Sequence, residues 1–427
     1  MALTVAALAT SGVAQAQPVV QDWHAILRRL SRTALNEYVR EPDSALMIAA
    51  ALTEARRRTG AGSAGFDACF AARAGKRGLV ALDRALDAAF SCLAPEGTAP
   101  DIAEESAVAV ASAALASLDP ASRLISSVEV ARLKKLLVPA NRLGVGVSYS
   151  MTPAGLKVVS TIWGGPAEAA GLVAGDVITA IDDVQTVTLG MDNSAAAMRG
   201  PAGSAVVLSV LGADGKLQTF NLLRRGIPAI ETMRQGDALT VRFNALTQEI
   251  PSTFTKALAA QGTDAKVLVI DLRHNPGGLL DVVVSVADAL LASGPIFSQA
   301  DRRNRVETRA KAGATFGDKP VVVIVDRKTE SGAELIAAAL ADNHRALIVG
   351  EPSSGSGSVH DLIPVGGPAP LKLKTAELMR ANGEPLVGHP VVPDCEVSAN
   401  DPTIFAIAAR IGLDGLSTCP APVHRPE

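Results

Sequence analysis

One serine stands where a side chain could do acyl-transfer chemistry. Ser331 lies in the segment 329–335, TESGAEL, after the continuous apolar run 321–325 and at the start of a helical stretch over 332–341. A serine at a strand-to-helix junction can project above the end of a sheet, and the next N–H can bind a developing oxyanion. An ordinary serine N-cap is the alternative interpretation of the same pattern.

A second segment, 271–278, has the sequence DLRHNPGG and could bind an anion through its backbone. It follows the apolar run 267–270 and precedes a helical stretch over 279–291. A glycine-rich turn between a strand and a helix leaves N–H groups pointing outward at the helix N-terminus, where they can hold an oxyanion. The same turn could simply lead into a capped helix, and it is too short for a phosphate-binding P-loop.

A third segment, the glycine- and serine-rich stretch 350–360, contains Ser356 and His360. It connects the apolar run 346–349 to another β segment over 359–363. Taken alone, a loop of this composition is normally a flexible connection.

The elements that must position these residues fall into three regions and a short tail. Residues 17–140 are rich in Ala, Leu and Arg with apolar residues at helical spacing, which predicts a helical bundle or cap. From 141 to 226, short β-branched runs are separated by glycine turns, which predicts a compact β-rich module. Residues 227–416 combine continuous apolar runs with helical stretches, as expected of an α/β core with strands buried on both faces. Residues 417–427 are a C-terminal tail.

The composition allows real hydrophobic cores and argues against two kinds of site. Of 427 residues, 48% are hydrophobic, 19% charged and 3% aromatic, so the cores must consist of Ala, Val, Leu and Ile. The net charge is -3 and no basic block is interleaved with aromatic residues, so no nucleic-acid partner is expected. No metal is expected either, because no ligand spacing such as HExxH occurs among the six histidines. These are His24, His274, His344, His360, His389 and His424.

The first sixteen residues indicate an exported protein. Residues 1–16 form an apolar segment that ends in AQA (14–16), a pattern typical of a signal-peptide cleavage site, although no Lys or Arg precedes it. No apolar run reaches the roughly 18–20 residues needed to cross a bilayer.

The four cysteines agree with export. Cys69 and Cys92 lie in one region, and Cys395 and Cys419 lie in another, without the CxxC spacing of a metal site. Two local disulfides, 69–92 and 395–419, are the most economical arrangement in an oxidising compartment. Four reduced, buried thiols are the alternative.

The motifs occur in an order that resembles the C-terminal processing peptidases, also called tail-specific proteases. The resemblance implies an α/β multidomain fold with a helical N-terminal region, a β-rich PDZ domain over 143–226, and an α/β peptidase core of the ClpP/crotonase-like kind. It covers residues 118–397 and is carried by LDPAS (118–122), GPAEAAGL (165–172), GDVI (175–178), DLRHNPGG (271–278), RALIVGEP (345–352) and VPD (392–394).

The same resemblance implies a function and a class of partner. The chain would be a serine-type endopeptidase of the periplasm or cell envelope that recognises the C-terminal tails of unfolded or tagged proteins. Val145, Gly146 and Val147 match the carboxylate-binding loop of the PDZ domain. No cofactor is implied, and the helical region would allow a homo-oligomer.

The family's catalytic residues match only in part. Ser331 falls on the nucleophile, but Ser356 occupies the position of the general-base lysine. His360 stands where the family has the glutamine that orients that lysine. The remaining matches are the oxyanion donors, Gly332 with Gly277 or Gly278, and Asp342, which matches an acidic residue that the family often carries.

Three hypotheses follow from the missing lysine. In the first, His360 is the base and Ser356 bridges it to Ser331 in a Ser–Ser–His relay, because imidazole has a suitable intrinsic pKa. In the second, the chain is a pseudopeptidase, an adapter or scaffold that binds protein C-termini through its PDZ groove without cleaving them.

In the third hypothesis, the base comes from elsewhere, either from a partner chain or from one of three residues, Lys372, Lys374 or His274. The ordinary interpretation of the two lysines is a solvated strand face. That of His274 is a hydrogen bond within its turn.

Overall fold

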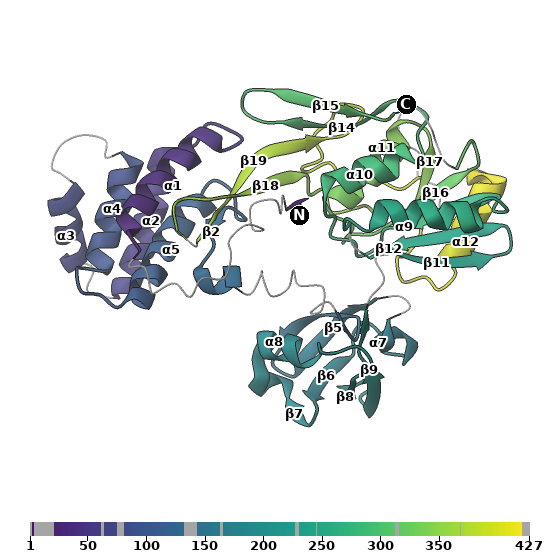
Figure 1. The fold of residues 1–427 in the computed structure, drawn as a ribbon, viewed down its shortest axis with the longest axis horizontal. Helices are drawn as coiled ribbons and strands as arrows, with labels where there is room; N and C mark the ends of the chain where they lie inside the picture. Colours follow the sequence, from purple (N-terminus) through teal and green to yellow (C-terminus); the bar gives the residue numbers. More distant parts are fainter. Residues whose placement is uncertain are drawn as a thin grey trace.

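The structure has three parts, which Figure 1 shows as a purple-to-blue helical region, a small teal β-rich domain and a larger green-to-yellow α/β core. A second sheet extends from the core to the helical region, so these two parts share strands. The computed structural model describes residues 2–3, 21–60, 64–74, 81–131, 143–162, 165–226, 230–244, 246–311, 316–367 and 369–420.

Five helices make up most of the described part of the N-terminal region, and residues 127–131 are helical as well. Asp22 caps the first of them by accepting the N–H of Ala25 at 2.9 Å. Leu27, Leu30 and Leu86 are fully buried between the helices, as their helical spacing predicts. The helices are α1 (Trp23–Glu37), α2 (Ser44–Thr59), α3 (Ala64–Ala74), α4 (Leu82–Leu93) and α5 (Pro100–Ala116).

The teal domain is built on one antiparallel sheet with the order β4-β5-β6-β8-β9, in which β4 is an edge strand. Along β8, buried side chains alternate with more exposed ones, which confirms the predicted period of two. The strands are β4 (Val147–Thr152), β5 (Gly155–Thr161), β6 (Val177–Ile181), β7 (Val184–Gln185), β8 (Ala205–Leu211) and β9 (Leu217–Leu223), with helices α7 (Pro166–Ala169) and α8 (Thr186–Ala197). At its base, β3 (Leu143–Gly144) pairs with β10 (Arg225–Gly226).

The α/β core is built on its own sheet, which has the order β11-β12-β13-β16-β17-β20. The strands of this sheet are parallel from β12 to β20. Leu268 and Ile270 face one hydrophobic cluster, and Val267 and Val269 face another, so β13 is buried on both faces as predicted. The strands are β11 (Ile230–Gln235), β12 (Ala238–Phe243), β13 (Val267–Asp271), β16 (Val321–Val325), β17 (Ala346–Gly350) and β20 (Cys395–Glu396).

Helices cover both faces of this sheet. Three of them pack with Leu268 and Ile270, and the fourth packs with Val267 and Val269 on the opposite face. The first three are α9 (Ile250–Ala257), α10 (Leu280–Asp288) and α11 (Gly332–Asp342), and the fourth is α12 (Ile404–Asp414). A π-helical turn, η3 (Leu258–Gly262), extends α9, and a 3-10 turn, η4 (Leu416–Thr418), follows α12.

The sheet that joins the core to the helical region has the order β1-β18-β19-β14-β15. Leu371 and Leu373 of β19 close the core of the helical bundle, and β2 (Arg123–Leu124) pairs with β19. The strands are β14 (Pro295–Ala300), β15 (Arg305–Arg309), β18 (Ser358–Ile363) and β19 (Leu371–Met379). This sheet therefore brings the LDPAS segment next to the strand that carries His360.

Both predicted disulfides are confirmed. Cys69–Cys92 links α3 to α4, and Cys395–Cys419 links β20 to the residue after η4. No cysteine of the described chain is free.

The N-terminal segment is described only in part. β1 (Ala2–Leu3) pairs in parallel with β18, and the remainder of the predicted signal peptide lies outside the described residues. None of the helices that the structure describes is both long enough and apolar enough to span a membrane.

Candidate active site

Ser331 lies on a strained turn between β16 and α11. Its backbone has φ 51° and ψ -116°, a combination that non-glycine residues rarely adopt and that costs about 1–3 kcal/mol. Ser331 is 1% exposed, and within the described residues its Oγ has no hydrogen-bond partner. Ser331 is the N-cap of α11, and Glu334 accepts its N–H as in a capping box, but Ser331 Oγ makes no cap hydrogen bond. The turn has the conformation expected of a nucleophile elbow.

The turn 271–278 packs directly against this elbow, and glycines make the close approach possible. A Cβ added to Gly277, where φ is +83°, would lie 2.7 Å from the nitrogen of Gly332 and 3.1 Å from Ser331 Cβ. A Cβ added to Gly332 would lie 3.1 Å from Val283 Cγ2 and 3.4 Å from the nitrogen of Gly278. The two segments singled out in the sequence therefore meet at Ser331.

Two backbone N–H groups beside Ser331 can bind an oxyanion. That of Gly332 is the first in α11 and has no partner within the helix. That of Gly277, the other predicted donor, is already engaged, because it donates to Asn275 Oδ1 at 2.9 Å. The N–H of Gly278 lies beside Gly332 and has no partner among the described residues. Of the two glycines considered for the second donor, Gly278 is therefore the one whose N–H is not engaged within the described residues.

Asn275 engages Gly277 because its own side chain is fixed. It is fully buried, and its Nδ2 donates to the carbonyl of Phe243 at 2.7 Å. This holds Oδ1 toward the N–H of Gly277.

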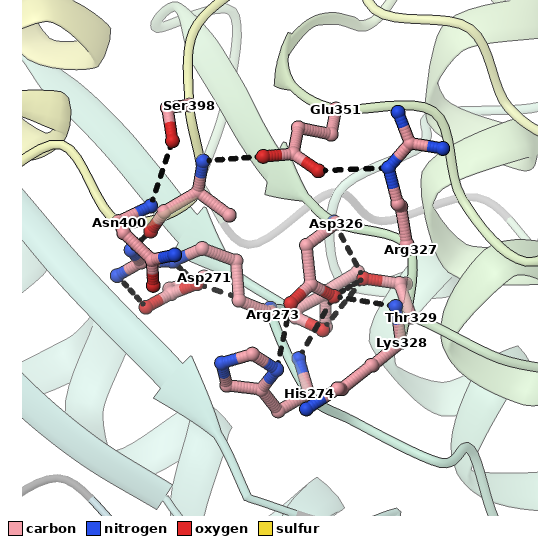
Figure 2. Close-up of polar contacts among 12 residues, drawn as sticks. Asp271, Arg273, His274, Asp326, Arg327, Lys328, Thr329, Glu351, Ser398 and Asn400 are labelled. Atoms are coloured by element: carbon pink, nitrogen blue, oxygen red, sulfur yellow. Dashed lines mark hydrogen bonds and ion pairs between the residues drawn. The ribbon is translucent and has the colours of Figure 1, made fainter. Parts of the chain in front are cut away.

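Polar side chains fasten the rest of the turn to neighbouring elements (Figure 2). Arg273 donates to both oxygens of the fully buried Asp271, at 2.9 and 2.8 Å, and its Nη1 donates to the carbonyl of Ala399. Glu351 accepts from the N–H of Ala399 and from Arg327 Nε. These contacts therefore join the turn to the segment that follows β20, and that segment to the residues that follow β16 and β17.

His274 is part of this framework and pairs with Asp326. Its Nδ1 lies 2.7 Å from Asp326 Oδ2, and its N–H donates to Asp326 Oδ1 at 3.0 Å. Burial would raise the pKa of Asp326, but the hydrogen bonds from His274 outweigh burial and lower that pKa. The partner of His274 therefore lies on the turn that follows β16 and not within its own turn, where the ordinary interpretation places it.

The lowered pKa of Asp326 predicts how stability depends on pH. Because the folded-state pKa is below the unfolded value, the stabilisation is present above that unfolded value, about 4, and is lost as the pH falls through the folded pKa. At pH 7 we expect Asp326→Asn to lower the free energy of unfolding by about 1–3 kcal/mol. Urea unfolding between pH 7 and pH 3 should show this difference shrinking; a difference that grows toward low pH would contradict the assignment.

Glu334 joins the elbow to the glycine- and serine-rich loop. It is fully buried, and its Oε2 accepts the N–H groups of Ser331 and Ser356, each at 2.9 Å. Its Oε1 accepts the Ser353 hydroxyl at 2.5 Å and the Gly355 N–H at 2.6 Å. Burial raises the pKa of Glu334, while these hydrogen bonds act in the opposite direction. The nitrogens of Ser331 and Ser356 are thus no further apart than twice 2.9 Å.

His360 lies on β18, four residues after Ser356, and its ring contacts Asp119. Its Nε2 is 3.2 Å from Asp119 Oδ2, and His360 is buried. Neither Ser356 nor His360 makes a hydrogen bond to Ser331 Oγ in this structure. The relay through Ser356 therefore stays a prediction.

The two lysines considered as alternative bases are buried, so the interpretation as a solvated strand face is wrong. Both are 8% exposed, because β2 and the LDPAS segment lie against them, whereas the helical bundle packs on the opposite face of β19. Lys374 Nζ lies 2.9 Å from Glu377 Oε1 and pairs with that carboxylate. Burial lowers the pKa of Lys372, and the positive charge of Arg123 lowers it further. Asp342, the matching acidic residue, pairs with Arg380 at 2.6 Å.

The predicted carboxylate-binding loop of the teal domain precedes its edge strand. Val145 is buried and its carbonyl accepts the N–H of Ala167, while the carbonyl of Gly146 accepts that of Ile162. Val147 begins β4, whose other edge is unpaired within the described sheet. An extended peptide can add to such an edge, with α8 packed alongside.

Sequence reasoning missed two residues of this site, Glu334 and Asp119. Glu334 stands three residues after Ser331, which is the spacing of a capping box, and that signal could have found it. Asp119 lies in the LDPAS motif, but its contact with His360 spans 241 residues and has no local signal.

Comparison with known proteins places this site in a family. The model of peptidase family S41 matches residues 237–397, and that of a PDZ domain matches 158–211. A carboxy-terminal-processing protease of Bartonella bacilliformis is 35% identical over 294 residues, which are 66% of this chain and 67% of that protein. The chain belongs to peptidase family S41.

Other relatives of this S41 peptidase agree. A carboxyl-terminal-processing protease of Picosynechococcus is 32% identical over 301 residues, covering 68% of this chain and 72% of the relative. The solved photosystem II D1 C-terminal processing protease has the same fold, with a TM-score of 0.60, 21% identity, and coverage of 92% of this chain and 98% of that one. The S41 peptidase is thus a PDZ-containing member of the carboxyl-terminal-processing serine proteases.

Proposed function

We propose that this chain is an active serine endopeptidase that cleaves proteins near their C-termini, with Ser331 as the nucleophile. The strained elbow is the observation that carries the proposal. Ser331 keeps an unfavourable backbone conformation and an unbonded hydroxyl beside the N–H groups of Gly332 and Gly278. Strain of this kind is maintained where a mechanism uses it, and a domain that only bound peptides would gain nothing from it.

In the proposed mechanism, His360 replaces the family's lysine as general base. Ser331 Oγ attacks the scissile carbonyl, and its proton passes through the Ser356 hydroxyl to the imidazole of His360. The oxyanion accepts hydrogen bonds from Gly332 and Gly278. His360 then protonates the leaving amine as the C–N bond breaks, and water hydrolyses the acyl-enzyme by the reverse proton path. None of these steps needs a cofactor.

Substrates reach this site through the PDZ domain. The loop around Gly146 captures the terminal carboxylate with backbone N–H groups, and the tail adds as a strand to β4. Two disulfides favour an oxidising compartment, so we place the peptidase in the periplasm or cell envelope, acting on unfolded or tagged proteins.

The test compares cleavage of a disordered substrate with an apolar C-terminus by the unsubstituted protein and by Ser331→Ala. We expect cleavage by the first and none by the second, with tail binding unchanged in both. Cleavage that persists in Ser331→Ala would refute the role of Ser331.

The second candidate function is that of a pseudopeptidase. The replacement of the family's general-base lysine by Ser356 favours it. It predicts that neither protein cleaves the substrate and that both bind its tail, which the same experiment measures.

A further inference from the structure

We propose that Asp119 positions His360 for proton transfer, so that the catalytic set also includes a residue of the LDPAS segment. The inference rests on the proposed function, because it concerns the base of that reaction. Asp119 precedes the peptidase domain in sequence, and β2 brings its segment to the sheet that carries His360.

The geometry is that of an aspartate–histidine pair. His360 Nε2 and Asp119 Oδ2 are 3.2 Å apart, and both side chains are largely shielded from solvent, at 9% and 16% exposure. A carboxylate next to one ring nitrogen favours the tautomer in which that nitrogen carries the proton. With Nε2 donating to Asp119, Nδ1 keeps the lone pair and is the nitrogen that can accept a proton.

Asp119 is itself held from both sides. The Ser122 hydroxyl donates to its Oδ2, and the N–H of Ala121 donates to its Oδ1 at 3.2 Å. Ser122 Oγ also accepts the N–H of Lys374 at 3.0 Å, and Lys374 is paired in register with His360. One short chain of hydrogen bonds therefore connects the carboxylate to the strand beside its histidine, so that neither partner can move independently.

The charge of Asp119 suits this task. Burial would raise the pKa of Asp119, but hydrogen bonds from His360, Ser122 and Ala121 outweigh burial and hold that pKa well below its usual range. Asp119 therefore stays ionised when His360 takes up a proton, and it stabilises the imidazolium that forms. Lys372 and Tyr38 also face Asp119, and their charges do not change over the acid range of the test below.

The proton balance of the reaction is complete with these groups. His360 Nδ1 gains the proton that Ser331 loses through Ser356, while Asp119 keeps its charge and receives no proton. The imidazolium then gives its proton to the leaving amine. Asp119 touches neither substrate nor Ser331, so it is a positioning residue.

The first test is Asp119→Asn, which can keep the contact with Nε2 but removes the charge. We expect kcat to fall by roughly 10²–10⁴-fold with KM changed less than about threefold. The acid limb of the kcat/KM profile should move to lower pH, because the imidazolium loses the neighbouring negative charge. Ser122→Ala is the comparison: it removes one of the hydrogen bonds that hold Asp119 but leaves the charge of Asp119, so kcat should fall less than in Asp119→Asn and the acid limb should stay in place.

A second set of variants distinguishes a role of Asp119 in positioning His360 from a role in stabilising the fold. In Ser356→Lys/His360→Gln, which restores the residue types of the family, no histidine depends on Asp119, so adding Asp119→Asn should leave kcat within about threefold. Equal losses in both backgrounds, or an unmoved acid limb, would overturn the inference. If the Ser356→Lys/His360→Gln protein is inactive, the shift of the acid limb of the kcat/KM profile in Asp119→Asn tests the inference on its own.

The proposed function and the inference can fail separately. If Ser331→Ala abolishes cleavage but Asp119→Asn does not reduce it, the function stands and the inference is overturned. If the unsubstituted protein cleaves nothing, the function is refuted and the inference falls with it.

Discussion

Replacing Gly277 with alanine should lower kcat by at least roughly 10²-fold, because the new methyl group would occupy the space next to the oxyanion donor. At φ +83°, its Cβ would lie 2.7 Å from both the Gly332 nitrogen and the Glu330 carbonyl. Those atoms belong to the elbow, so either the elbow or the turn 271–278 must shift. A shift of about 1 Å in a catalytic group is enough to cost this much in rate. Steady-state cleavage of the disordered substrate measures the effect.

Gly236→Ala is the matched control for this substitution. Gly236 also has positive φ, +55°, and lies in the exposed turn between β11 and β12 of the α/β core. A Cβ added there would meet nothing within 4 Å. We expect a loss of roughly 1–2 kcal/mol in stability from backbone strain and an unchanged kcat. If Gly277→Ala behaves like Gly236→Ala, the contact between the turn and the elbow has no part in catalysis.

Glu334→Gln should damage both stability and activity. Four donors converge on the buried carboxylate, and an amide offers only one oxygen to accept them. At least one buried N–H of Ser331, Gly355 or Ser356 would then lose its partner, at a cost of about 1–3 kcal/mol. The loop that carries Ser356 would no longer be held against the elbow, so kcat should fall at least roughly tenfold. Urea unfolding and cleavage rates measure the two effects.

The control for Glu334 is a neighbouring glutamate on the same turn. Glu330 is half-buried and its side chain is not among the partners of the elbow or the loop. Glu330→Gln makes the same chemical change one residue before Ser331, and we expect stability and kcat to stay close to those of the unsubstituted protein. Equal effects from the two substitutions would show that the carboxylate at 334 does not connect the elbow to the loop.

Much of the fold could be predicted because its signals are local. The apolar run 321–325 is β16 with the same bounds, and the turn that follows has the backbone expected of an elbow. The disulfide partners could be predicted because each pair lies within one region. The helical, PDZ and α/β parts could also be distinguished in the sequence, because the spacing of their hydrophobic residues differs.

What could not be predicted depends on contacts between distant residues. Lys372 and Lys374 are buried because β2 and the LDPAS segment lie beside β19, a contact between distant parts of the chain that the alternation within the strand does not reveal. The engaged N–H of Gly277 depends on the orientation of the Asn275 side chain, which the carbonyl of Phe243 fixes. The partner of His360 lies 241 residues away in another part of the chain.

The most direct test of Ser331 as a working nucleophile is covalent labelling by a fluorophosphonate, followed by intact mass and peptide mapping. The reagent needs an activated serine but no bound protein substrate. We predict a single adduct on Ser331 in the unsubstituted protein, and a labelling rate at least roughly 10²-fold lower in His360→Ala. No adduct on Ser331, or an equal rate in both proteins, would contradict a histidine-assisted serine peptidase.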